Sequence, residues 1–175
     1  MSSQGLTYTS REEIEVYRFS PLVVIGVSLV AIFLQAFLPT RVNFLRIFDL
    51  PLLVTIFFAM ARRNPVSGLL TGCFIGLVQD ALTAKMIGLY GIAKTIVGYV
   101  ASSLGVRIDV ENPGSRLLLT LAFYFLHRIV YLVVQRGLVQ ENVSGEWLHH
   151  LGAAFANALL AIVLFAVLDR FKQRT

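Results

Sequence analysis

Charged residues are scarce in this chain, and so are cysteines and the motifs of common catalytic sites. Charged residues make up 14% of the 175 residues, against about 25% in a typical soluble domain. Hydrophobic residues make up 57%, and the mean hydropathy is +0.75. Because so apolar a chain exposes too little polar surface to dissolve as a globular domain, the composition predicts an integral membrane protein.

The shortage of cysteine and histidine excludes the usual metal and disulfide frameworks. Cys73 is the single cysteine, so it has no partner for an internal disulfide or a multi-cysteine site. His127, His149 and His150 have no cysteine or second acidic ligand at zinc-like spacing. We therefore expect no metal site and no cofactor, and we interpret His127 and its neighbour Arg128 as a packed polar pair.

Catalytic motifs are absent as well. The sequence holds no Gly-x-Ser-x-Gly and no His-Glu-x-x-His, and Gly88-Leu89-Tyr90-Gly91 lacks the strand and the lysine of a phosphate-binding loop. Asp80 stands alone within the predicted helices, because Asp49 and Asp169 fall at helix ends, and an aspartyl protease needs two such groups. The sequence predicts a protein that is not an enzyme.

The net charge of +5 does not indicate nucleic-acid binding. A nucleic-acid interface needs a basic face or aromatic stacking platforms. Here the basic residues fall at the ends of apolar runs, which is where membrane proteins keep them. We expect the lipid bilayer, and no nucleic acid, to be the main surrounding of the chain.

Six apolar runs predict an all-α, polytopic membrane protein with six transmembrane helices. Pro39 is expected to end the first helix, and the second is either a short helix or one extended backward into the linker of residues 40–47. The predicted helices span residues 21–38, 48–61, 66–82, 87–104, 117–134 and 148–168.

The chain divides into three parts. Residues 1–20 are polar and form an N-terminal arm without a cleavage site after the first apolar run, so we expect that helix to be retained. Residues 21–168 form the six-helix transmembrane domain, and residues 169–175 form a short basic tail.

The distribution of lysine and arginine among the loops predicts the orientation. With six helices, one side of the membrane carries Arg11, Arg18, Arg62, Arg63, Arg107, Arg116, Arg170, Lys172 and Arg174. The other side carries Arg41, Arg46, Lys85 and Arg136. Because cytoplasmic loops carry the excess of basic residues, we expect the arm and the tail to lie in the cytoplasm.

A stripe of small residues runs along the third predicted helix and ends at an acid. Gly68, Gly72, Gly76 and Asp80 follow one another at intervals of four. Small residues at this spacing let two membrane helices approach closely. The fourth predicted helix has a similar face, formed by Gly91, Thr95, Gly98, Ser102 and Gly105. Together these faces predict close helix packing, either between the two helices or with a partner.

Several polar residues fall within the predicted spans. A charged group there is costly unless it is paired or hydrated, so these residues are functional candidates. With the predicted orientation they lie mostly in the outer half, which indicates a polar cluster or a shallow cavity that opens outward. We expect Asp80 to anchor it as the counter-ion of Lys94 or Arg128. The predicted cluster consists of Asp80, Lys94, His127, Arg128 and Asn157.

The stretch GLLTGCFIGLVQDAL followed by IGLYGIAKTIVGYV resembles the central signature of the rod shape-determining protein MreD family. In that family a glycine-rich third helix ends in an acidic residue and a Gly-Leu turn opens the fourth. The positions that match this signature are Gly68, Gly72, Gly76, Asp80, Gly88 and Gly91.

The resemblance implies a non-catalytic subunit of the bacterial cell-elongation machinery. This machinery lies in the inner membrane and synthesises peptidoglycan. The partners of the subunit would be the bitopic scaffold MreC and, further, MreB, RodA and a transpeptidase. The family is also similar in fold to the S components of energy-coupling-factor transporters. A small-molecule-binding subunit of a vitamin uptake transporter is therefore the alternative function.

Overall fold

The computed structural model describes residues 19–83, 86–106, 108, 112–139 and 147–172. In these ranges the chain forms six α-helices and two short 3-10 helices, with no strand. The α-helices are α1 (Pro21–Arg41), α2 (Leu50–Arg62), α3 (Pro65–Leu82), α4 (Leu89–Gly105), α5 (Pro113–Val139) and α6 (Trp147–Leu168). The 3-10 helices are η1 (Asn43–Ile47) and η2 (Asp169–Phe171).

Proline and short polar side chains set the first turns of the helices. Pro21, Pro51 and Pro65 lie at the first or second position of α1, α2 and α3, where a missing N–H costs nothing. Asp49 caps α2 by accepting a hydrogen bond from Leu52 N, and Asn64 caps α3 in the same way. These local signals mark the starts of α1, α2 and α3 in the sequence.

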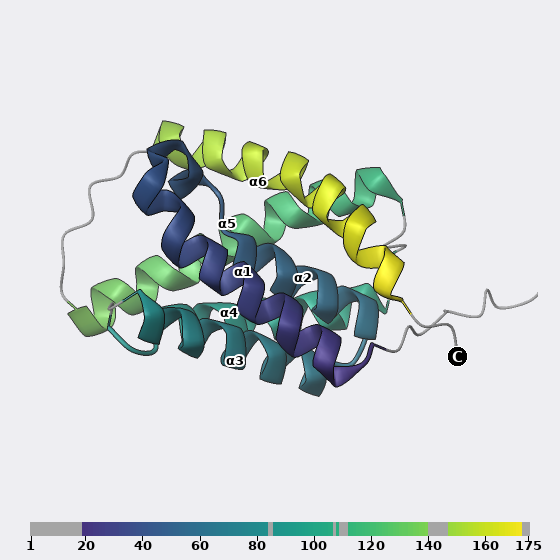
Figure 1. The fold of residues 1–175 in the computed structure, drawn as a ribbon. Coiled ribbons are helices and arrows are strands. Elements are labelled where there is room, and N and C mark those ends of the chain that lie inside the picture. Colours follow the sequence, from purple (N-terminus) through teal and green to yellow (C-terminus); the bar gives the residue numbers. More distant parts are fainter. Residues whose placement is uncertain (1–18, 84–85, 107, 109–111, 140–146, 173–175) are drawn as a thin grey trace, which may run out of the picture.

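Helix α2 is the centre of the bundle and contacts each of the other five α-helices. Figure 1 shows it between α6, along the top of the view, and α3, along the bottom. Every residue from Pro51 to Ala61 is buried. Phe57 and Phe58 pack there against Phe19, which precedes α1, and Phe57 also contacts Phe165 of α6. A helix that is apolar all round is buried in this way.

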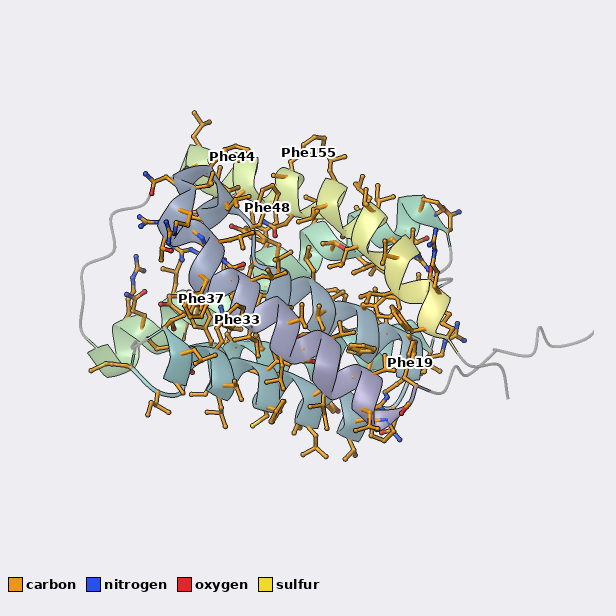
Figure 2. All side chains as sticks on the ribbon, viewed as in Figure 1. Phe19, Phe33, Phe37, Phe44, Phe48 and Phe155 are labelled. Carbon is orange, nitrogen blue, oxygen red and sulfur yellow. The ribbon has the colours of Figure 1, made fainter. Side chains whose placement is uncertain are left out.

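The outer faces of the surrounding helices are apolar, which suits contact with lipid. Among the residues that the structure describes, four helical segments are long and apolar enough to cross a membrane: Pro21–Arg41, Pro65–Leu82, Pro113–Gly137 and Leu148–Phe171. Phe44 before α2 and Phe155 on α6 are both more than half exposed, and Figure 2 shows them on the outside of the bundle. The same figure shows Phe19 at one end of the bundle and Phe48 near the other.

Helix α2 is too short to cross a bilayer alone. Its 13 residues correspond to about 20 Å at 1.5 Å per residue, against a hydrocarbon core of about 30 Å. At the N-terminal side of α2, the short helix η1 and polar side chains occupy the depth that the helix does not reach. We call this end of the bundle, where α2, α4 and α6 begin, the cavity end, after the cavity described below.

The all-helical fold class and the presence of six α-helices are confirmed for the described residues, but several boundaries differ from those predicted. The largest difference is at α5, which runs from Pro113 to Val139 and so extends beyond the predicted residues 117–134 at both ends. Pro39 does not end the first helix, because α1 continues to Arg41 with Pro39 inside its last turns. The segment before the second helix is not part of it but forms η1. The predicted arm up to residue 18 and the last three residues of the tail lie outside the described residues.

Candidate functional site

The small-residue faces of α3 and α4 lie against each other, in the most extensive helix pair of the fold. A Cβ atom added at Gly68, Gly72 or Gly76 would overlap a backbone carbonyl oxygen of α4, that of Gly98, Lys94 or Tyr90 respectively. A Cβ at Gly98 would likewise overlap the carbonyl oxygen of Gly68. The two backbones therefore touch, and this face of α3 is covered by the chain itself.

Asp80, at the end of the glycine stripe, caps the start of α4. Its carboxylate accepts hydrogen bonds from the backbone N–H groups of Gly88, Tyr90 and Gly91, at 2.9, 3.1 and 3.0 Å. Gly88 has a φ of 110°, a left-handed conformation that favours glycine. The unpaired N–H groups and the positive dipole end of α4 compensate the buried negative charge.

The expected ion pair of Asp80 with Lys94 or Arg128 is therefore wrong. Lys94 pairs instead with Asp49, the residue that caps α2, and its Nζ lies 3.1 and 3.0 Å from the two carboxylate oxygens. Lys94 is fully buried. Its Nζ is also 3.5 Å from Nε2 of His127 and 4.9 Å from the centre of the Tyr90 ring. Lys94 thus joins the start of α2 to α4 and α5.

Asn157 and Gln35 complete this polar network from α6 and α1. Asn157 Oδ1 accepts a hydrogen bond from Asp49 N at 2.8 Å, and Asn157 Nδ2 donates to the carbonyl oxygen of Ile47 at 2.8 Å. Gln35 Oε1 accepts from Leu50 N at 3.1 Å. Because α2 starts deep in the bundle, its free backbone groups find side-chain partners in place of water.

A cavity of about 180 Å³ lies over this network at the cavity end. All six helices, or the segments that lead into them, contribute to its wall. Its lining includes three tyrosines, three histidines and two arginines: Tyr90, Tyr124, Tyr131, His127, His149, His150, Arg46 and Arg128. No group of three metal-ligating side chains converges within the part of the chain that the structure describes.

Only some members of the predicted polar cluster lie together in the structure. Lys94 contacts His127, and both reach Asn157 through Asp49. Arg128 lies in the cavity wall, where its Nη2 donates to Nε2 of His150 at 2.8 Å. Asp80 binds the start of α4 instead, so Asp49 holds the anchoring position that we expected Asp80 to occupy.

Sequence reasoning missed Asp49, because an acid at a helix end is normally solvated. Two signals could have found it. Asp49 stands two residues before Pro51, the pattern of an N-cap, and the helix that follows is too short to bring its start to the membrane surface. Tyr90, Tyr124 and Tyr131 gave no signal of their own, since tyrosine is common in membrane helices.

These observations define a class: an all-helical protein with membrane-spanning segments and a polar cavity at one end of the bundle. A comparison with family models then identifies the chain more closely. The chain belongs to the rod shape-determining protein MreD family, whose model matches residues 17–175. Neither the comparison with curated proteins nor the comparison with solved structures gives a match.

Family membership implies a role in the determination of rod shape. It also indicates a structural protein of the inner membrane that takes part in the cell-shape machinery, in a family not known for catalysis. The resemblance noted in the sequence is thereby confirmed over nearly the whole chain.

Proposed function

We propose that the chain is a non-catalytic subunit of the cell-elongation machinery and acts by binding an MreC-like scaffold protein. MreB, RodA and a transpeptidase are further partners in this proposal. The observation that carries it is the family match over residues 17–175. The absence of catalytic motifs from the sequence agrees with a protein that works through contacts.

The proposal includes six membrane crossings with both termini in the cytoplasm. Four segments have the length and composition of a span, and α2 and α4 are shorter helices. Helix α2 is buried inside the bundle, and α4 packs against α2, α3 and α5 while its outer face remains exposed at Ile92, Ile96 and Tyr99. The excess of basic residues in the loops at the other end supports a cavity that faces outward.

The glycine stripe is proposed to serve internal packing, and not partner binding. A partner helix could reach Gly68, Gly72 and Gly76 only after α4 had moved away, because α4 carbonyl oxygens occupy the space above them. The partner would then use faces of the bundle that are exposed in the isolated chain.

Copurification tests the proposal directly. The tagged full chain is extracted from its own cells in a mild detergent, and everything that elutes with it is identified and quantified by mass spectrometry. A tagged, unrelated six-helix membrane protein from the same cells is the control. We expect an MreC-like protein in near-stoichiometric amount with the chain and absent from the control.

The alternative function makes the opposite prediction. The polar cavity is the feature that favours an S-component-like transport subunit. A stoichiometric vitamin, together with an ATPase module and no cell-wall protein, would replace our proposal with that alternative.

A further inference from the structure

The cavity carries positive charge that its own carboxylate does not neutralise. Arg46 and Arg128 both line it. Asp49, which also lines it, forms an ion pair with Lys94 below the cavity floor. Within the described residues, neither Arg46 nor Arg128 has a carboxylate oxygen within 4.0 Å. The described part of the cavity wall therefore carries more positive than negative charge, at one end of an apolar bundle.

The guanidinium of Arg128 is held by two contacts but keeps one hydrogen-bond donor without an acceptor among the described residues. Its Nη2 donates to His150, and its Cζ lies 5.8 Å from the centre of the Tyr131 ring. Its Nε is buried and has no hydrogen-bond partner within the described residues. A buried donor without an acceptor is unfavourable, so this N–H is a position where a ligand oxygen would be stabilised.

Gln79 supplies an unused acceptor in the same cavity. Its side chain is 3% exposed and lines the cavity, yet Oε1 has no hydrogen-bond partner within the described residues. A ligand that satisfies both groups carries an anionic oxygen for Arg128 and a hydroxyl or amine donor for Gln79.

An apolar groove of about 230 Å³ adjoins the cavity and shares two of its wall residues, Gln35 and Phe48. Leucines of α1 and α6 line this groove, among them Leu34, Leu38 and Leu160. A polar cavity beside an apolar groove matches an amphiphile as well as a small polar molecule.

We propose that the cavity binds a phosphate-bearing polar group, with Arg128 and Arg46 on the phosphate and Gln79 on a neighbouring hydroxyl or amine. A phosphate presents more acceptor oxygens than a carboxylate and can accept from two arginines that reach it from different helices. The group comes either from the headgroup of an anionic membrane lipid or from a soluble phosphomonoester. The proposal does not depend on which protein partner the chain binds.

Two binding assays on the purified full chain distinguish the sources. In the first, phosphatidylglycerol or phosphatidylcholine is added in detergent, and the lipid retained per chain is counted by native mass spectrometry. In the second, glycerol 3-phosphate is titrated by calorimetry. The variants are Arg128→Gln, Arg46→Gln in η1, and the matched control Arg136→Gln, which removes the same charge from an exposed position on α5 outside the cavity.

We expect retention of phosphatidylglycerol by the wild type and by Arg136→Gln, and a loss of affinity of about tenfold or more in Arg128→Gln and Arg46→Gln. Binding of glycerol 3-phosphate with the same dependence on the variants, and no lipid retention, assigns the site to a soluble phosphate. Absence of both ligands from the wild type overturns the proposal. So does binding by Arg46→Gln and Arg128→Gln that equals binding by Arg136→Gln. Arg46→Gln keeps the test informative if Arg128→Gln does not fold, because Arg46 is exposed.

Discussion

Lys94 Nζ lies 3.0 Å from Oδ2 of Asp49, a residue 45 positions earlier in the chain. The lysine side chain is fully buried and the aspartate side chain is 17% exposed. This pair holds the start of the central helix α2 against α4, below the cavity. The same carboxylate also caps α2, so one side chain serves both the helix and the contact between helices.

Breaking this pair is expected to destabilise the fold. Lys94→Met leaves the Asp49 carboxylate without its counter-ion and should lower the free energy of unfolding by about 3–5 kcal/mol. Asp49→Asn should have a comparable effect, and the double variant should lose less than the sum of the two. Reversible unfolding in mixed micelles measures these values, with the exposed Arg136→Met as control. Additive losses would contradict a direct pair.

Asp80 is expected to matter through α4, and not through a lysine. Asp80→Ala removes the acceptor for three backbone N–H groups and should destabilise the protein by about 1–3 kcal/mol. Asp80→Asn keeps one acceptor oxygen and should recover part of this loss. Hydrogen exchange followed by mass spectrometry should show faster exchange at the first turn of α4. An unchanged exchange rate in that turn would show that Asp80 does not cap α4.

The glycine stripe offers a comparison between sites with and without space for a methyl group. Gly72→Ala forces a Cβ atom onto the carbonyl group of Lys94 and should cost at least about 1–3 kcal/mol. Gly26→Ala in α1 meets nothing within 4 Å. It should be neutral or stabilising by up to about 1 kcal/mol, because alanine favours the helix.

Thermal stability and membrane level of the two glycine variants provide the measurement. Equal behaviour of Gly72→Ala and Gly26→Ala would mean that α3 and α4 do not approach as closely as the structure has them.

Much of the fold could be predicted from the sequence, because apolar length and proline position are local signals. The start of α1 at Pro21 falls where the sequence predicts it, and α3 starts at Pro65, one residue before the predicted start at Val66. The partner of Lys94 could not be predicted, since it depends on how α2 and α4 are rotated against each other. The position of Asp80 at the end of the glycine stripe did not identify the counter-ion of Lys94. The position of Asp49 as the cap of a short buried helix is the better indicator. Asp80 accepts hydrogen bonds from nearby backbone N–H groups, and Asp49 forms the ion pair with Lys94.

The orientation can be tested with single cysteines in a Cys73→Ser background. Arg41 and Arg170 are both exposed and lie at opposite ends of the bundle. With the proposed orientation, a membrane-impermeant maleimide should label Arg41→Cys in spheroplasts, while Arg170→Cys should react only after the membrane is permeabilised. The reverse pattern would place the cavity on the cytoplasmic side.

The most direct test of the central claim is the shape of the cells in which this chain is native. After depletion of the chain, the ratio of cell length to cell width is measured by microscopy. We expect the ratio to fall toward that of a sphere and expression of the wild-type chain to restore the rod. Cells that remain rod-shaped after the protein has disappeared would contradict this claim.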